Sequence, residues 1–295
     1  MMHYRRIGVT VKSDIPAKDA IVAHVIRILR KTGADIRVDR KRIRGVPSAK
    51  GLKTLRGTGE IDLLLILGGD GTILRTIREM ECFSVPILSI NRGNIGFLAE
   101  MSVGEASRLL PKFLCGEGIV DERRALRVIA RRGAGTVTEG FVLNEAVISQ
   151  GTIARLIDLK TTVNGEPLTT FRADGLILAT PTGSTAYTLA AGGPIVHPQV
   201  QATILTPINS HSFSQKPIVI PGDHRIEVEV LGRGAKFGDV DVSMTLDGQV
   251  YAALHPGDRI FAAVSEHTVK FLRRKKETYY ATLRSKLKWG GRPEE

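Results

Sequence analysis

The chain is organised around the stretch Ile61-Asp-Leu-Leu-Leu-Ile-Leu-Gly-Gly-Asp-Gly-Thr-Ile-Leu-Arg-Thr76. Residues Asp62 to Leu67, all aliphatic but the first, run without alternation into a glycine-rich turn, which is typical of a strand buried on both faces. Thr72 to Met80 contains no Gly or Pro, so we expect a helix there. A turn from a parallel strand into a helix is where open α/β sheets bind ligands, because it offers free N–H groups to anions.

The turn places one carboxylate, Asp70, among three glycines, Gly68, Gly69 and Gly71. The glycines let the backbone come close to a phosphate chain. A carboxylate would repel phosphate unless it holds a metal ion or accepts a proton, so Asp70 is a candidate for a chemical role. The alternative is an ordinary turn in which Asp70 is the N-cap of the next helix.

Composition indicates a globular protein of two domains. The chain has 295 residues, of which 42% are hydrophobic and 24% charged, values typical of folded chains with a large core. Cys82 and Cys115 are far apart and predict neither a disulfide framework nor a zinc site, so we expect a reduced, cytoplasmic setting. No apolar run approaches the roughly 20 residues of a membrane helix.

The net charge of +12 indicates an anionic partner: nucleic acid, a membrane surface or phosphorylated small molecules. Much of the excess lies in residues 40–56, 123–132 and 273–288. Aromatic residues make up only 5% and are not interleaved with these clusters, so the stacking platforms of single-strand binders are missing. We interpret the clusters as solvated basic faces and do not favour nucleic acid as a partner.

Predicted strands and helices alternate along the first 118 residues, the pattern of a doubly wound, mostly parallel α/β domain. Residues 40–59 are basic and glycine-bearing without firm periodicity, and we expect a mostly mobile loop there. Further strands are expected at Ile7–Val11, Ala34–Asp39 and Val85–Ile90, and helices at Ala17–Thr32 and Val103–Phe113.

Residues 119–270 predict an all-β, sandwich-like domain, because short β-branched segments are separated by turn signals such as Asn164-Gly and Asp247-Gly. Gly232 to Gly238 has glycines at the wrong spacing for a dinucleotide fingerprint, and we predict a turn. Residues 271–295 form a basic tail with helical spacing over 277–289, which we expect to pack back on the first domain, residues 1–118.

Polar residues interrupt two apolar segments of the β domain. Asn144 and Glu145 lie inside the apolar run 141–148, where they are costly unless they meet ligand or solvent, or unless a bulge or capped turn satisfies them. Asp174 leads into residues 180–194, which are rich in small and hydroxylated residues. There Tyr187 could stack on a purine and Thr185 could bond to it; the alternative is a glycine-rich turn with Tyr187 in the core.

Together these stretches resemble the ATP-NAD kinase family. Its hallmarks occur in family order as the turn Gly68–Gly71, the pair Asn144-Glu145 and the stretch Thr182–Tyr187. The resemblance spans about residues 5 to 270, and the three hallmarks together are specific, whereas lipid kinases and phosphofructokinases share the first alone. Asn209-Ser210 stands where many members have a different small pair. Supporting matches are Gly96–Leu98, Thr206–Ser212 and Asp247–Gln249.

The resemblance implies transfer of the γ-phosphoryl group of ATP, or of polyphosphate in some members, to the 2′-hydroxyl of the adenosine ribose of NAD. Asp70 would accept the hydroxyl proton, and Mg²⁺ or another divalent metal would neutralise charge, as phosphoryl transfer requires. A homodimer or homotetramer is implied as well. The residues implied to bind NAD and ATP are Gly68, Gly69, Asp70, Gly71, Arg75, Phe97, Asn144, Glu145, Arg155, Arg172, Asp174, Thr185, Ala186, Tyr187, Thr188, Leu189, Ala190 and Gln249.

Within that set, Asn144, Glu145 and Asp174 match positions that hold ribose and base, and residues 185–190 match the wall beside the adenine. The basic residues suit a pyrophosphate. One alternative is a diacylglycerol- or sphingosine-type lipid kinase, against which stand the Asn144-Glu145 pair and the absence of an amphipathic membrane-facing stretch in the sequence. Another is a polyanion-binding protein, whose binding would weaken steeply with salt and survive Asp70→Ala.

Overall fold

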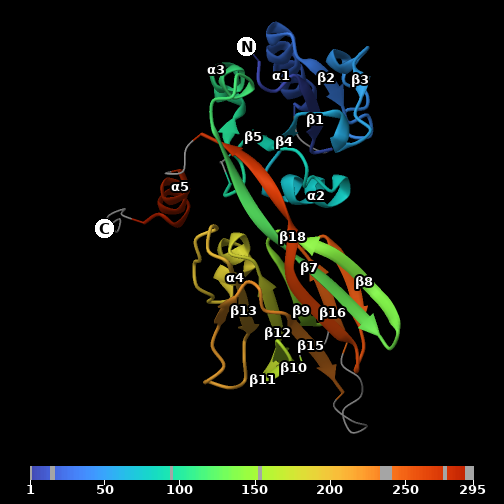
Figure 1. Ribbon diagram of the computed structural model, residues 1–295, viewed down its shortest axis with the longest axis vertical. Coiled ribbons are helices and arrows are strands. Elements are labelled where there is room, and N and C mark those ends of the chain that lie inside the picture. The colour runs from blue at the N-terminus through green and yellow to red at the C-terminus, as the bar shows by residue number, and fades with distance from the viewer. Residues whose placement is uncertain are drawn as a thin grey trace. The chain divides into compact units, whose positions relative to one another are not determined.

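The computed structural model describes residues 2–13, 17–93, 96–151, 155–232, 241–274 and 278–289. The chain forms two compact units. The first unit consists of Met1–Glu122 together with Val269–Glu295, and the second unit consists of Arg123–Thr268. The second unit is thus an insertion between two chain segments of the first, as the colour gradient of Figure 1 shows.

The first unit has a parallel sheet with the strand order β5-β4-β1-β2-β3, and β6 pairs with β5. The carboxyl end of β18 (Arg259–Arg273) also pairs with β5, where Phe271 lies opposite Ile87. This sheet confirms the predicted α/β fold class. The strands are β1 (Arg6–Val11), β2 (Asp35–Val38), β3 (Lys53–Thr54), β4 (Leu63–Leu67), β5 (Ile87–Asn91) and β6 (Met101–Ser102).

Two helices cover one face of this sheet. α1 (Lys18–Thr32) and α3 (Val103–Leu114) share a core with the alternate strand residues Ile7, Val9, Leu63 and Leu65, as the period of two in a strand requires. α1 ends at Gly33, whose φ of 76° few other residues adopt. The first unit also contains α2 (Asp70–Met80) and α5 (Thr278–Leu287). In the described part of the chain, no helix is long and apolar enough to cross a membrane.

The stretch 40–59 differs from the mobile loop that the sequence predicts. It contains the short helices η1 (Pro47–Ala49) and η2 (Thr58–Glu60) with β3 between them. Arg42 is buried and forms ion pairs with Asp39 and with Glu79 of α2. Sequence periodicity missed this order because the apolar residues are buried one at a time, without a regular spacing. They are Ile43, Val46, Ala49 and Leu55.

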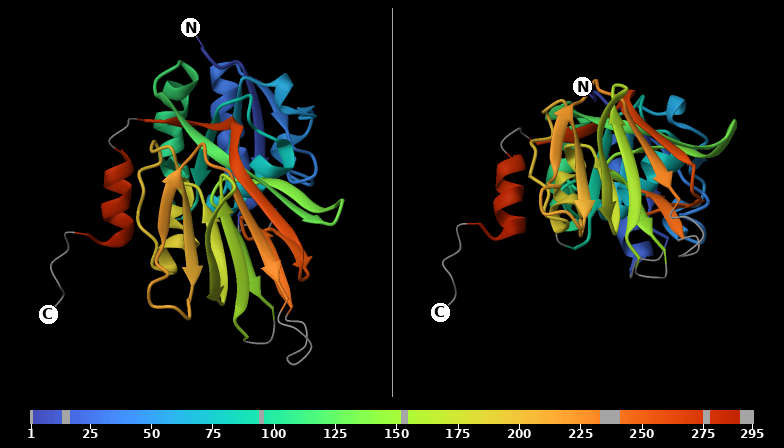
Figure 2. Two further views of the ribbon diagram at one scale, coloured as in Figure 1. Left: turned by 60° about the horizontal axis from the view of Figure 1, so that its bottom comes forward. Right: turned by 90° about the horizontal axis from the view of Figure 1, so that it is seen from below.

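The second unit contains two antiparallel sheets that share one apolar core, which confirms the predicted sandwich-like domain (Figure 2). One sheet has the order β14-β13-β12-β9-β16-β17; the other joins β11, β10, β15 and the first part of β18, and β7 forms a hairpin with β8. The bounds are β7 Ile119–Arg132, β8 Gly135–Val142, β9 Glu145–Gln150, β10 Ile157–Val163, β11 Glu166–Ala173, β12 Gly175–Ala179, β13 Ala202–Ile208, β14 Ile218–Pro221, β15 Ile226–Leu231, β16 Val242–Leu246 and β17 Val250–Leu254.

Two predicted turns occur as short hairpin connections. Asn164-Gly165 joins β10 to β11 as a two-residue loop, and Asp247, Gly248 and Gln249 join β16 to β17 as a three-residue loop; Asn164, Gly165, Asp247 and Gly248 have positive φ. This conformation matches the twist of antiparallel strands and favours Asn, Asp and Gly. The turn predicted at Gly232–Gly238 falls largely on residues 233–240, outside the described part of the chain.

Candidate active site

The turn Gly68–Gly71 connects the buried strand β4 to α2. A Cβ on Gly68 would lie 2.6 Å from the hydroxyl oxygen of Thr72, so the turn is too tight for a side chain there. Gly69 is the N-cap and Asp70 is the first residue of the helix. This placement excludes the interpretation of Asp70 as an ordinary N-cap, and no side chain among the described residues caps the start of α2.

Backbone groups of the loop after β5 hold the Asp70 carboxylate. The N–H of Phe97 donates to Oδ2 at 2.9 Å, and the N–H of Leu98 donates to Oδ1 at 3.3 Å. A Cβ on Gly96 would lie 2.5 Å from the carboxyl carbon of Asp70, so the loop backbone is packed directly on the carboxylate. Each oxygen keeps acceptor capacity for a further donor. The structure thus brings Phe97 to Asp70 through its backbone.

Ser89 of β5 fixes the same loop from the sheet side. Its hydroxyl donates to the carbonyl of Leu98 at 2.9 Å and accepts from the N–H of Glu100 at 3.1 Å. Arg75 projects from the exposed side of α2, where its Nε lies 2.7 Å from the Glu79 carboxylate. The first unit therefore presents a glycine turn, a fixed carboxylate and one surface arginine along a single helix start.

In the second unit, Asn144 lies in a capped turn and Glu145 is the first residue of the strand that follows it. β8 ends at Val142 and β9 begins at Glu145. The Asp247 carboxylate accepts N–H bonds from Leu143, Asn144 and Glu145 at 2.9, 2.9 and 3.1 Å. Of the alternatives that the sequence leaves open, the structure has the capped turn, in which a carboxylate from a distant hairpin satisfies the backbone between the two strands. Gln249 belongs to that same hairpin turn.

Glu145 is 8% exposed, and its carboxyl has an unusual environment. Burial, followed by the neighbouring charge of Asp247, raises its pKa to about 7, whereas a backbone hydrogen bond from Tyr187 lowers it. Its Oε2 has no hydrogen-bond partner in the described part of the chain. A buried acceptor in this state is costly unless a ligand donates to it.

The stretch 182–190 is packed against this turn as η3 (Thr182–Thr185) and α4 (Tyr187–Ala190). The N–H of Thr180 donates to the Asn144 carbonyl at 2.9 Å, and a Cβ on Gly183 would lie 2.5 Å from the carbonyl carbon of Asn144. Tyr187 is 46% exposed, which excludes the core alternative for its ring. The start of the stretch thus packs on Asn144, and Tyr187 donates a backbone hydrogen bond to Glu145. The other predicted residues of the stretch are its neighbours in η3 and α4: Thr185, Ala186, Thr188, Leu189 and Ala190.

Asp174 lies at the opposite end of β12 from that cluster. Ala179 pairs with Glu145, whereas Asp174 precedes Gly175, which pairs with Ser149. At about 3.3 Å per residue, Asp174 is about 17 Å from Ala179 along the strand. Asp174 accepts a hydrogen bond from Asn209 Nδ2 at 2.9 Å. The exposed residues Arg155 and Arg172 belong to this end too, because Ile157 pairs with Ala173. The structure does not bring these three to Glu145.

The sequence did not predict that Gly96 packs on Asp70, or that Asp247 caps the turn at Asn144. Gly96 contacts Asp70 from 26 positions along the chain, and Asp247 reaches Asn144 across 103 positions. Both residues lie in stretches that match the family, and this match was the available indication that they belong to the site. No local sequence pattern identifies the residue that either one contacts.

Comparison with known proteins places both units in one family. The model of the ATP-NAD kinase N-terminal domain matches residues 19–118, and that of the ATP-NAD kinase C-terminal domain matches residues 143–274. The NAD kinase of Citrifermentans bemidjiense is 37% identical over 98% of this chain and 100% of its own length, and that of Geotalea daltonii is 43% identical over 79% and 80%.

Two solved structures are also similar. An NAD kinase from Archaeoglobus fulgidus in complex with ATP is 26% identical, with a TM-score of 0.72 over 95% of this chain and 99% of that chain. Yeast NADH kinase complexed with NADH has a TM-score of 0.88 over 99% and 90%, and its 24% identity supports the fold alone.

Proposed function

The chain belongs to the ATP-NAD kinase family, and we propose that it transfers the terminal phosphoryl group of ATP to the 2′-hydroxyl of the adenosine ribose of NAD, giving NADP and ADP. It is accordingly a phosphotransferase. The observation that carries the proposal is the Asp70 carboxylate, which follows a glycine turn and is held by two N–H groups of the loop 96–98.

Asp70 suits the role of proton acceptor. As the ribose oxygen bonds to the γ-phosphorus and the bond to the ADP oxygen breaks, the hydroxyl proton must be received by a nearby base. Asp70 is already oriented by Phe97 and Leu98, so the step requires no rearrangement of the carboxylate. The positive end of the α2 dipole favours the phosphates of the donor.

A divalent metal fits this site as an ion shared with the substrate. Among the described residues, no group of three or more His, Cys, Asp or Glu side chains comes together. Mg²⁺ at kinase sites is typically bound through one or two carboxylates and the substrate phosphates, and Asp70 is the carboxylate of the turn. When bound, the ion neutralises charge on the transferring phosphoryl group.

The second unit supplies the groups that suit NAD. The unpartnered Oε2 of Glu145 can accept a bond from a ribose hydroxyl, and the exposed ring of Tyr187 can stack on a base. Asp174, with Arg155 and Arg172 near it, offers charged groups at the other end of β12. We propose a cytoplasmic enzyme that assembles as a homodimer or homotetramer, on the family resemblance.

The proposal is tested by measuring NADP formation from NAD, Mg²⁺ and ATP, with polyphosphate as a second donor. Asp70→Asn should lower kcat by about a thousandfold while NAD still binds, because the variant keeps the shape of the side chain and loses the base. No NADP from either donor would refute the function and call for a lipid diol as acceptor. Equal turnover in both proteins would keep the reaction and remove Asp70 from it.

A further inference from the structure

The loop that holds Asp70 is itself held from the far end of the chain. Arg273, the last residue of β18, is only 7% exposed. Its Nη2 donates to the carbonyl of Phe97 at 3.2 Å and its Nη1 to the carbonyl of Ala99 at 3.4 Å. Because the N–H of Phe97 donates to Asp70, the guanidinium lies one residue away from the catalytic carboxylate.

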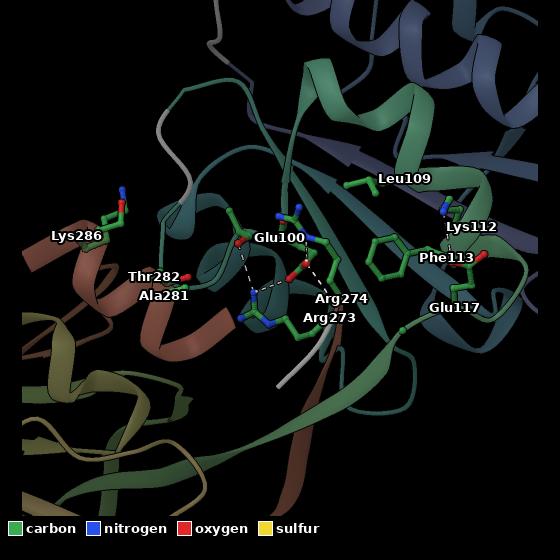
Figure 3. Close-up of a pocket in the computed structure, with 13 residues that line it drawn as sticks. Glu100, Leu109, Lys112, Phe113, Glu117, Arg273, Arg274, Ala281, Thr282 and Lys286 are labelled. Carbon is green, nitrogen blue, oxygen red and sulfur yellow. Dashed lines mark hydrogen bonds and ion pairs between the residues drawn. The ribbon is translucent and has the colours of Figure 1, made fainter. Parts of the chain in front are cut away.

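Carboxylates keep the guanidinium in place, as Figure 3 shows for Glu100. Glu100, which is 4% exposed, lies 3.4 Å from Arg273 Nη1 and 2.9 Å from Arg274 Nε. Asp121 lies 3.7 Å from Arg273 Nε. The backbone of Glu100 is fixed as well, because Arg274 Nη2 donates to its carbonyl at 2.7 Å. A buried charge that is paired in this way can hold a fixed orientation.

The contacts require the shape of arginine and not merely its charge. Arg273 reaches two carbonyls of one loop and a carboxylate with a single rigid, planar fork. A lysine would keep the positive charge beside Glu100, but a compact ammonium on a flexible stem does not reproduce that fork. Arg273→Lys therefore tests the effect of the loop geometry while the charge beside Glu100 is kept.

We propose that Arg273 is a positioning residue for phosphoryl transfer, which acts by fixing the loop 97–100 and, through it, the Asp70 carboxylate. Arg273 stabilises this loop from one side while Ser89 of β5 holds it from the other. The inference rests on the proposed function, since it concerns the turnover of that reaction. It assigns to the carboxyl end of β18 a part in catalysis without contact to substrate.

The cluster is open to small solutes. Glu100, Arg273 and Arg274 line a cavity of about 670 Å³, together with residues of α3 and α5 such as Phe113 and Thr282. Figure 3 shows these side chains around the same space. A guanidinium ion from solution could therefore reach the position that a truncated Arg273 side chain leaves.

The first experiment compares wild type, Arg273→Lys and the matched control Arg37→Lys in the NADP-forming assay. Arg37 also pairs with two carboxylates of the first unit, Asp35 and Glu60, but on β2 and η2. Arg273→Lys should lower kcat by about 100-fold, the effect of a displacement of about 1 Å at the reacting groups. Its KM values for NAD and ATP should stay within about threefold, and Arg37→Lys should turn over like wild type.

Rescue separates positioning from folding. Guanidinium ion is added to Arg273→Ala at concentrations that leave wild type unaffected. It should raise the kcat of the variant at least about tenfold, whereas added ammonium ion should not raise it. If neither Arg273 variant folds, Ser89→Ala tests the same loop with every ion pair intact. It removes the two hydrogen bonds of the Ser89 hydroxyl to the loop and should lower kcat by about tenfold without a change in KM.

The outcomes are distinct. Wild type without NADP-forming activity would refute the proposed function itself. An active wild type with Arg273→Lys within threefold of its kcat would overturn the positioning role, as would a loss that appears only in KM. A folded Ser89→Ala with unchanged kcat would also overturn it, because the loop geometry would then not control turnover.

Discussion

Asp70 and Glu145 are acidic side chains at the ends of buried strands, but their environments are opposite. Asp70 follows the glycine turn after β4, and Glu145 begins β9 after the capped turn. Asp70 has an N–H donor on each oxygen and a loop packed against it. Glu145 is buried beside a second carboxylate, and its Oε2 has no partner within the described residues. One carboxylate is fixed before any ligand arrives, and the other lacks a donor that a ligand could bring.

The difference fits two tasks. A group that receives a proton must be held at the right place, which backbone donors achieve. A group that recognises a hydroxyl gains more from an unsatisfied acceptor, because a ligand without that hydroxyl leaves it unpaired. Sites that fix one carboxylate and leave another unsatisfied can therefore separate catalysis from selection.

The largest expected effect is a loss of folding stability when the cap of the turn before Glu145 is removed. Asp247→Ala removes the acceptor of three N–H bonds and places alanine at a φ of 48°. We expect a loss of roughly 3 kcal/mol or more in the free energy of unfolding, measured by urea denaturation. Asp247→Asn, which keeps one acceptor oxygen and tolerates the conformation, is the control; equal stability of the two variants would contradict the cap.

The fixed state of Asp70 is tested by Gly96→Ala. The new Cβ would collide with both carboxylate oxygens, so either the loop or Asp70 must move. We expect kcat to fall by about 100-fold, equivalent to about 2.7 kcal/mol, with substrate binding largely kept. Gly93→Ala, where a Cβ meets no heavy atom within 4 Å, should turn over normally. A fully active Gly96→Ala would show that the packing does not matter.

The raised pKa of Glu145 predicts that the free energy of unfolding depends on pH. Its pKa is about 7 in the folded protein and near 4.5 when unfolded, so the folded chain loses stability as pH rises through this interval. Glu145→Gln does not titrate there. Its stability relative to wild type should therefore be greater at pH 8 than at pH 5 by about 2.5 kcal/mol. The measurement is urea or thermal unfolding of both proteins. If the stability difference between Glu145→Gln and wild type is the same at pH 5 and pH 8, the pKa of Glu145 is not raised.

The sequence predicted those parts of the site that depend on local pattern. An unbroken aliphatic run ending in glycines predicts β4 and its turn, and β-branched segments between turn signals predict the second unit. It left a capped turn open at Asn144 but did not identify Asp247 as the cap, because Asp247 lies 103 residues away and no local pattern marks such a pair. Arg42 escaped for the same reason, since its partner Glu79 lies on α2.

The insertion of the second unit into the first has a consequence for protein synthesis. Chains emerge from the ribosome with the amino end first, so Gly68–Gly71 and the whole of Arg123–Thr268 are available before Arg273 exists. Until then, β5 lacks its pairing with Phe271 and the loop 97–100 lacks its arginine. A nascent chain that stalls between residues 187 and 273 would therefore contain the three family hallmarks while the loop 97–100 still lacks its contacts with Arg273.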